Sequence, residues 1–366
     1  MRKAILVIYQ DIDSGAKVVT EEILSHLRSA HPNHSLIIHQ QNPQHFSGAF
    51  SAVKNLMWSL LDCVQTVKRH NHQVTVTYTP YFLAALVASL LKKPTQRVIF
   101  HFHGDQAITR IPFQPGWLGK VRYLYIWLLG KTIALLQSVA LKRSDRLIFV
   151  AREAYQHITT KYHLNRDASH VVIVPNGVST KHYHPAKSKN EIQVICSIRK
   201  KLHIQQHAVV LLYSGRIDEK KGIHHILSAM MELLSHQSNL HYKLIIMHPS
   251  YRDKDSAEYI STLRAIIKKG QLDVTFVSQP AQLKPYYQLA DICLLPSEQE
   301  MMPLVMLESL ACGTPFMGTK KGNVASVLNN IEKQLILKDN SGKSIASQIK
   351  WFSQLNSKQR SHIQEL

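Results

Sequence analysis

Short apolar, β-branched runs alternate with longer segments of helical period along this chain. In the first half, strands are predicted at 3–9, 35–39, 74–78, 97–102, 146–150 and 171–175, and most are followed by a polar or Gly/Pro break and a helix. In the second half, strands are predicted near 208–214, 242–247, 273–277, 291–295 and 315–319, with helices near 222–236, 255–269, 281–288 and 303–312. Strands and helices that alternate in this way predict parallel, doubly wound sheets.

The alternation is interrupted once, and this break predicts two domains. Pro175-Asn176-Gly177-Val178 contains an Asn-Gly turn signal, and the polar, Lys-rich region 179–205 follows it. We therefore expect an N-terminal domain over 1–178 and a C-terminal domain over 179–346. The chain has 366 residues, 45% of them apolar, which is enough for two cores. The predicted fold class is α/β, with two Rossmann-like domains whose strand ends face each other across a cleft.

The segment Pro296–Thr319 contains two carboxylates, Glu300 and Glu308, eight residues apart. Pro303 suits the first helical position and Gly313 a left-handed cap, so a helix is expected over 303–312. The N-terminus of such a helix offers free backbone N–H groups and a partial positive charge to a phosphate oxygen. The residues assigned to this phosphate site are Met302, Pro303, Leu304 and Val305. An ionised Glu308 accepts hydrogen bonds, for which the hydroxyl pair of a ribose is a natural partner.

This segment resembles the signature of the GT-B glycosyltransferases of family 4. The shared pattern is a Glu, seven residues, a second Glu, a run of small residues and Gly-Thr-Pro. Met302-Pro303 stands where many relatives have Phe-Gly. The resemblance implies a GT-B fold and a nucleotide-sugar donor. It also implies that Glu300 orients the hydroxyls of the donor sugar and Glu308 those of the ribose.

Two further loops follow predicted strands and carry basic or glycine residues. Arg216 and Lys221 lie five residues apart in Gly215–Gly222, where a guanidinium fork and an ammonium can grip a diphosphate from two sides. The segment resembles the Gly-Arg and Lys-Gly element of the same family, which implies that this pair holds the donor diphosphate.

After the first strand the family usually has a Gly-Gly pair. This chain has Ser14-Gly15, and we assign Gly15 to the donor.

The predicted strand 97–102 runs into two histidines. By the family resemblance His103 lies against the donor sugar, and His101 is expected to point to the opposite face. The chain departs from the family at Met247–Ser250, where relatives often have a Gly-rich turn, and at Ser179, where they commonly have Asp.

The net charge of +20 indicates an anionic partner. A membrane face or a polyanionic acceptor fits, whereas no nucleic-acid-binding pattern is present and nucleic acid is not expected. The helix 117–142 mixes aromatic and basic residues as interfacial helices do, and its alternative is a buried helix that covers the sheet. Tyr123–Leu141 is interrupted by Lys131 and Gln137, so no membrane span is predicted.

Cysteines and the N-terminus predict the compartment. Cys63, Cys196, Cys293 and Cys312 lack metal-ligand spacing and are expected to be reduced core thiols. The chain enters a strand without a signal-peptide pattern. We therefore expect a cytoplasmic protein, peripheral on the inner face of the cell membrane. Asp11-Ile-Asp13 and Asp253-Lys-Asp255 have the letters of a metal motif but lie in polar loops, so neither a metal nor a cofactor is expected.

The predicted function is a retaining, metal-independent, hexosyltransferase-type glycosyltransferase. It would move a sugar from a nucleotide-diphosphate sugar, for which a UDP-sugar is the first expectation. The acceptor would be a hydroxyl of a lipid-linked molecule, a glycan or a protein. The reaction would serve the assembly of cell-surface polysaccharide, glycolipid or glycoprotein. Preplaced positive charge lowers the barrier to diphosphate departure. The catalytic candidates are His103, Arg216, Lys221 and Glu300.

The main alternative function is that of a non-catalytic GT-B-like partner subunit of an active glycosyltransferase. A GT-B phosphorylase is disfavoured because no pyridoxal lysine site is evident. The acceptor is expected to contact the loops 40–55 and 104–118. Residues 347–366 are expected to form a terminal helix that crosses back onto the first domain.

Overall fold

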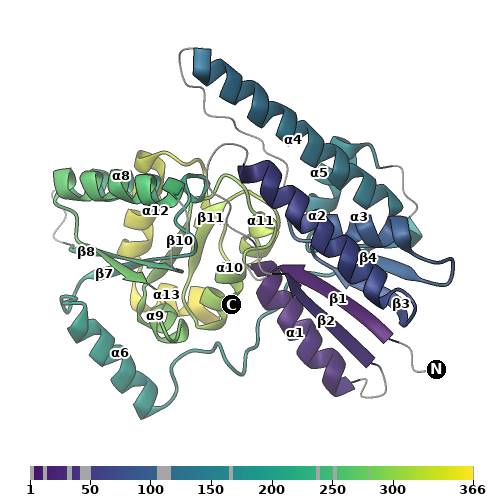
Figure 1. The fold of residues 1–366 in the computed structure, drawn as a ribbon. Helices are drawn as coiled ribbons and strands as arrows, with labels where there is room; N and C mark the ends of the chain where they lie inside the picture. The colour runs from purple at the N-terminus through teal and green to yellow at the C-terminus, as the bar shows by residue number, and fades with distance from the viewer. Residues whose placement is uncertain are drawn as a thin grey trace. The chain divides into compact units, whose positions relative to one another are not determined.

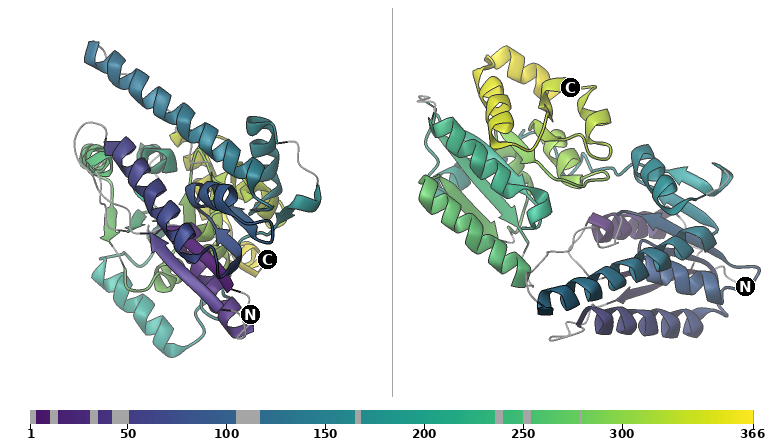
Figure 2. Two further views of the ribbon diagram at one scale, coloured as in Figure 1. Left: turned by 45° about the vertical axis from the view of Figure 1, so that its right-hand side comes forward. Right: turned by 90° about the horizontal axis from the view of Figure 1, so that it is seen from above.

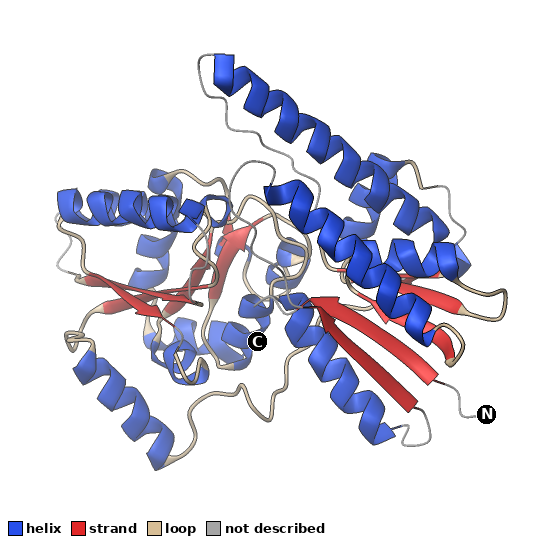
Figure 3. Ribbon diagram, viewed as in Figure 1, coloured by secondary structure: helices blue, strands red, loops and turns tan. Residues whose placement is uncertain are grey.

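The computed structural model describes residues 4–10, 15–30, 35–41, 51–104, 117–164, 168–235, 240–249, 254–278 and 280–365. The chain divides into two compact units, Met1–Pro175 and Asn176–Leu366 (Figure 1). Each unit contains one six-stranded sheet whose paired strands are parallel. Helices lie on both sides of the strands in each unit (Figure 3). The prediction of two Rossmann-like halves is therefore confirmed.

The first unit is built on the sheet β2-β1-β3-β4-β5-β6. Its elements are β1 (Ala4–Gln10), α1 (Gly15–Ala30), β2 (Ser35–Gln41), α2 (Ser51–His70), β3 (Val74–Thr79), α3 (Phe82–Leu91), β4 (Arg97–Phe102), α4 (Trp117–Arg143), β5 (Arg146–Phe149), α5 (Arg152–Tyr162), η1 (Ala168–His170) and β6 (Val171–Ile173). The strands lie where the apolar runs predicted them, because side chains on both faces of a covered parallel sheet are apolar.

The second unit is built on the sheet β12-β11-β10-β7-β8-β9. Its elements are α6 (Lys189–Lys201), β7 (Val209–Ser214), η2 (Glu219–Lys221), α7 (Ile223–Ser235), β8 (Tyr242–His248), α8 (Lys254–Gly270), β9 (Val274–Ser278), α9 (Lys284–Leu289), β10 (Ile292–Leu295), α10 (Leu304–Ala311), β11 (Phe316–Thr319), α11 (Val324–Leu328), η3 (Lys333–Leu335), β12 (Ile336–Leu337), α12 (Gly342–Gln354) and α13 (Ser357–Glu365). The predicted strands and helices of this half are all present, with ends that differ by a few residues.

The order of strands in the second sheet places two loops side by side. β7 pairs with β10 on one side and with β8 on the other, so the winding direction reverses at β7. The register aligns Ile292 with Leu211 and Cys293 with Leu212. The carboxyl ends of β7 and β10 therefore meet at a topological switch point, which is where ligands bind in sheets of this type.

A helix occupies part of the region that was expected to be a polar linker. α6 begins at a capping box, in which the Ser188 hydroxyl accepts from the Glu191 N–H and Glu191 accepts from the Ser188 N–H. Cys196 on this helix is exposed, whereas Cys63, Cys293 and Cys312 are buried. The prediction of four core thiols is thus wrong for Cys196, because α6 turns that residue to solvent.

The C-terminal segment forms two helices, α12 and α13, instead of the single helix expected over 347–366. Leu355 and Asn356 separate them. Ile349, Phe352 and Ile363 are buried in the core of the second unit. The described part of this segment is grouped with the second unit, and its return onto the first domain stays a prediction.

α4 is not the buried helix that was one of the two expectations for its sequence, since 28% of the most apolar 18-residue window in Tyr123–Arg143 is buried. By length and composition alone this segment could cross a membrane. That it does not cross one stays a prediction. In the first unit its N-terminal half extends beyond the neighbouring helices (Figure 2).

Candidate functional site

The turn after β7 is bonded to the loop after β10. The backbone carbonyl of Lys220 accepts hydrogen bonds from the Glu298 N–H at 2.8 Å and from the Ser297 hydroxyl at 3.2 Å. Gly222 has φ +76°, and a Cβ atom there would collide with the carbonyl oxygen of Pro296. Only glycine fits this position without strain, because it is both left-handed and in close contact with backbone.

The bonded loops bring two predicted site residues together. Lys221 Nζ lies 2.6 Å from Glu300 Oε1, although the two residues are 79 positions apart in the chain. The Lys221 side chain is 22% exposed and that of Glu300 10%, so the pair lies at the surface of the unit but is partly screened from water. The arrangement places a cation and a carboxylate at the carboxyl ends of adjacent strands.

Arg216 lies in the same turn as Lys221. The Tyr213 hydroxyl donates to the Arg216 carbonyl at 2.5 Å, which fixes the backbone of the turn. The side chain of Arg216 is exposed. Gly215, which precedes it, has φ +148° and donates its N–H to the Met247 carbonyl on β8. The guanidinium is thus anchored through its backbone and remains accessible to a ligand.

The loop that carries Glu300 and Met302 is held by two hydrogen bonds and one close backbone contact. The Asn323 N–H donates to the Met301 carbonyl at 2.7 Å, and the Asn176 side-chain amide donates to the Met302 carbonyl at 2.8 Å. Gly322 has φ +55°, and a Cβ atom there would overlap the carbonyl oxygens of Glu300 and Met301. These contacts preorganise the loop before any ligand arrives.

α10 begins one residue later than predicted. Pro303 is the residue before the helix, with φ −69° and ψ 126°, and Leu304 is the first helical residue. Pro303 makes no side-chain cap, so it leaves the first backbone N–H groups of α10, those of Leu304 and Val305, uncapped. Gly313 has φ +78°, which confirms the predicted left-handed residue after the helix.

Glu308 on α10 is held by a buried tyrosine. The Tyr287 hydroxyl donates to Glu308 Oε2 at 2.6 Å and lies 3.1 Å from Ser214 Oγ at the end of β7. Burial raises the pKa of the Glu308 carboxyl, and hydrogen bonds from Tyr287 and Tyr183 oppose this effect. Burial also raises the pKa of the Tyr287 hydroxyl well above its usual value, so it stays protonated and able to donate.

His101 and His103 lie at the end of β4 in the first unit. The centres of their two rings are 4.0 Å apart. The expectation that His101 points to the face opposite His103 is therefore wrong. Residues two apart along an extended strand point to the same face. The Tyr78 hydroxyl is 2.6 Å from His101 Nδ1, and the Nε2 atoms of both histidines are buried without a hydrogen-bond partner among the described residues. Burial lowers the pKa of His101 to about 4 and that of His103 to about 3.

Several predicted positions lie at or beyond the limits of the described residues. Gly15 is the first residue of α1, while Ser14 and the Asp11-Ile-Asp13 motif precede it outside the described residues. Most of the predicted acceptor loops and Asp253 lie outside them too. Within the part of the chain that the structure describes, no three His, Cys, Asp or Glu side chains are grouped as metal ligands would be.

Family models match both units. Residues 195–365 match the model for glycosyl transferases group 1, and residues 14–182 match the model for Glycosyltransferase Family 4. The chain belongs to glycosyltransferase family 4.

One curated relative and two solved structures are similar to this chain. A lipopolysaccharide 1,2-N-acetylglucosaminetransferase of Salmonella typhimurium is 31% identical over 200 residues, which are 53% of this chain and 50% of that protein. The chain thus spans about half the length of this curated relative. Sucrose-phosphate synthase of Thermosynechococcus elongatus matches with a TM-score of 0.74 at 19% identity, over 100% of this chain and 95% of that one. Anabaena HepE in complex with UDP and glucose matches with a TM-score of 0.72 at 14% identity, over 100% of this chain and 92% of that one. The family 4 chain therefore has the GT-B fold.

The sequence analysis does not identify Tyr287 and Asn176 as candidate site residues. The Asn-Gly pattern predicts only a turn at Asn176, yet the side-chain amide and the backbone N–H of Asn176 both contact Met302. Tyr287 lies on the short helix α9, just before the buried strand β10. A tyrosine that is buried needs a hydrogen-bond partner for its hydroxyl, and this requirement is the signal that could have identified it.

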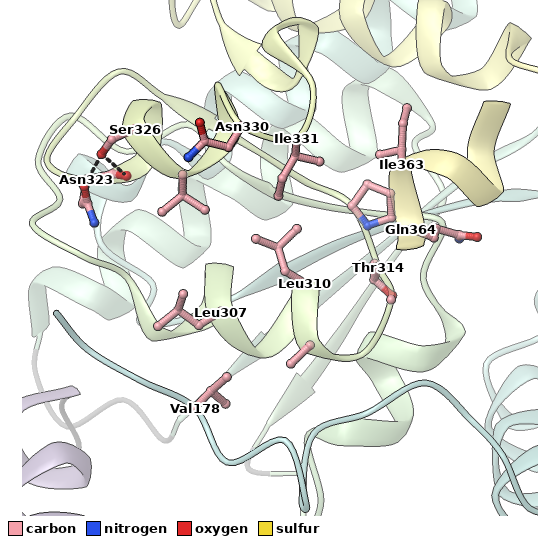
Figure 4. Close-up of a pocket in the computed structure, with 14 residues that line it drawn as sticks. Val178, Leu307, Leu310, Thr314, Asn323, Ser326, Asn330, Ile331, Ile363 and Gln364 are labelled. Carbon is pink, nitrogen blue, oxygen red and sulfur yellow. Dashed lines mark hydrogen bonds between the residues drawn. The ribbon is translucent and has the colours of Figure 1, made fainter. Parts of the chain in front are cut away.

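A cavity of about 630 Å³ lies beside α10 in the second unit (Figure 4). Its lining includes Val178, Leu307, Leu310, Asn323, Val327 and Ile363. None of the predicted donor-binding residues is among the residues that line it. The cavity is therefore separate from the Lys221 and Glu300 pair.

Proposed function

We propose that this family 4 chain is a retaining, metal-independent glycosyltransferase that uses a nucleotide-diphosphate sugar. The observation that carries the proposal is the 2.6 Å pair of Lys221 and Glu300 at the switch point of the second sheet. A cation held beside a carboxylate suits a donor that presents a diphosphate next to a sugar. Glu300 then has two tasks, because it orients Lys221 and accepts hydrogen bonds from the sugar hydroxyls.

The chemistry follows from where charge develops. When the anomeric bond breaks, negative charge moves onto the leaving diphosphate. Lys221, Arg216 and the uncapped N–H groups at the start of α10 offset that charge, and preplaced groups of this kind are worth most where water is excluded. The acceptor oxygen bonds to the anomeric carbon on the face that the diphosphate leaves. The hydroxyl proton of the acceptor passes to a leaving phosphate oxygen, so the configuration is retained and no enzyme nucleophile is required.

The donor and acceptor are proposed from the relatives. The Anabaena HepE structure holds UDP and glucose, which supports a UDP-sugar as donor. The Salmonella relative is a lipopolysaccharide N-acetylglucosaminetransferase, which supports a lipid-linked or glycan hydroxyl as acceptor and a role in cell-surface assembly. Because a lipid-linked acceptor lies in a membrane, we propose that the chain works in the cytoplasm, peripheral on the inner face of the cell membrane.

Hydrolysis of a panel of UDP-, GDP-, ADP- and dTDP-sugars tests this proposal. We expect one nucleotide class to be hydrolysed with and without a chelator, and its diphosphate to raise the melting temperature by mass action. NMR of the released sugar reports the anomer formed first, which must match that of the donor. Activity that collapses on chelation and returns with Mg²⁺ or Mn²⁺ contradicts metal independence. Neither hydrolysis nor binding of any donor favours a non-catalytic partner subunit instead.

A further inference from the structure

α4 exposes large apolar side chains along one face. Leu124, Leu128 and Leu135 are 54%, 52% and 65% exposed. Val121 is 50% and Trp127 42% exposed. On the other side of the helix, Leu129, Ala140 and Leu141 are buried in the first unit.

The exposed residues share a face because of their spacing. Positions 121, 124, 128 and 135 follow the three- and four-residue steps that align side chains along a helix. An ordinary surface helix carries polar residues on its exposed face, whereas α4 has large apolar residues on its exposed face as well as on its buried face. A helix that is apolar all round is normally surrounded by protein or by lipid.

The charges on α4 favour lipid over protein. Its charged residues are Lys120, Arg122, Lys131, Lys142 and Arg143, and its sequence contains no Asp or Glu. Lys131 Nζ lies 5.6 Å from the centre of the Trp127 ring. Aromatic rings and lysines with long apolar stems are the side chains that suit the boundary between lipid headgroups and acyl chains. The N-terminal half of α4 also extends beyond the neighbouring helices of its unit (Figure 2).

We propose that α4 docks this chain on an anionic lipid bilayer. The helix lies along the membrane plane, with Leu124, Trp127 and Leu128 inserted below the headgroups and Lys120 and Lys131 at the lipid phosphates. It does not need to span the bilayer, because its buried face remains packed in the first unit. The benefit of docking rests on the proposed function, since it would bring a lipid-linked acceptor to the enzyme.

Vesicle co-sedimentation of the full chain tests the docking. The vesicles are phosphatidylcholine with or without phosphatidylglycerol, each at low and at high salt. We expect binding only to the anionic vesicles, with a marked loss at high salt because the headgroup attraction is screened. The double variant L124S/L128S should bind about tenfold more weakly or worse, since two apolar anchors are removed. K120E/K131E should lose at least about fivefold for each cation.

Two variants with matched exposure serve as controls. Leu234 on α7 is 51% exposed, close to the 52% of Leu128, so L234S should bind vesicles like the wild type. Lys200 on α6 is exposed and lies in the second unit, and K200E should also bind like the wild type. Circular dichroism and melting curves verify that each variant is folded.

Four results would overturn the docking. The first is no binding of the wild type to anionic vesicles at low salt, and the second is equal binding to neutral and anionic vesicles. The third is that the α4 variants bind as well as their controls. The fourth is that light scattering shows a wild-type dimer that dissociates in L124S/L128S. The last would assign the face to a second copy of the chain.

Hydrolysis of the donor is measured without vesicles in the same preparations. Lost docking with retained hydrolysis therefore sinks only this inference, whereas lost hydrolysis with retained docking sinks only the proposed function.

Discussion

The Tyr287 hydroxyl donates a 2.6 Å hydrogen bond to Glu308 Oε2 and so joins α9 to α10. Tyr287 is fully buried, and its hydroxyl also lies 3.1 Å from Ser214 Oγ at the end of β7. Residues of α9, α10 and β7 therefore meet at one tyrosine hydroxyl. This arrangement fixes the direction of Glu308 before a donor binds, which is what a residue that recognises a ribose requires.

Tyr287→Phe should raise the KM for the donor about tenfold while kcat changes less. The variant keeps the ring in the core and removes only the hydrogen bond to a charged group. Steady-state kinetics with the identified donor measures the split. Tyr286→Phe is the matched control, because Tyr286 is the preceding residue on α9 and only partly buried. An unchanged KM in Tyr287→Phe would show that Glu308 needs no positioning.

Lys221→Met should lower kcat by about a hundredfold to a thousandfold, as when one preplaced donor to a developing anion is lost. Methionine keeps the apolar stem and removes the charge that pairs with Glu300. Lys220→Met is the control, because it removes a neighbouring lysine of the same turn while the backbone bonds of Lys220 remain available. Equal rates for the two variants, measured by release of the nucleoside diphosphate, would contradict the assigned role of Lys221.

Glu308→Gln should raise the melting temperature at neutral pH and weaken nucleoside diphosphate binding about tenfold. Burial raises the pKa of Glu308 above its usual 4.5, so the native state binds more protons than the unfolded state just above pH 4.5. Stability from this group is thus present below pH 4.5 and is lost as pH rises through the native pKa. The advantage of glutamine should therefore shrink in melts recorded near pH 4. A variant that melts lower than the wild type at pH 7 would refute this account.

His101 and His103 should make the first unit sensitive to acid. The pKa of His101 falls from 6.5 to about 4 on folding, so the native state binds fewer protons. Stability from this group is present above pH 6.5 and is lost as pH falls towards 4, by about 3 kcal/mol in total. His103, with a pKa of about 3, acts in the same direction.

His101→Gln should flatten this acid dependence while it leaves a polar partner for Tyr78. Chemical denaturation at pH 7 and pH 4.5 gives the change in unfolding free energy for each protein. The exposed His72 in the same unit supplies the control His72→Gln, which should keep the slope of the wild type. Identical slopes for all three proteins would mean that another group causes the acid sensitivity.

Gly222→Ala should destabilise the second unit and reduce turnover. Its φ of +76° costs an alanine about 1–2 kcal/mol, and the new Cβ atom would press on the Pro296 carbonyl and displace the loop that carries Glu300. Gly177→Ala meets open space and should behave like the wild type in thermal melts and in donor hydrolysis. Normal turnover in a folded Gly222→Ala would show that the loop tolerates displacement.

Local sequence chemistry determined the elements of this protein. Apolar, β-branched runs located the strands of both sheets except β12, because side chains on each face of a covered parallel strand must be apolar. Gly313 marked the end of α10, since a left-handed residue follows a helix there. The family pattern in Pro296–Thr319 and Gly215–Gly222 supplied the candidate site residues after β7 and β10, which stay predictions.

Only the tertiary structure decided which of those residues meet. Lys221 contacts Glu300 because β7 and β10 are neighbours in the sheet, and strand order is not written in local periodicity. The Tyr287 contact with Glu308 likewise joins two helices whose packing depends on the whole core. The sequence left open whether the helix 117–142 is interfacial or buried, and only the structure shows apolar side chains of α4 exposed. Hydrophobicity reports what a helix prefers to contact, whereas exposure depends on what the fold places against it.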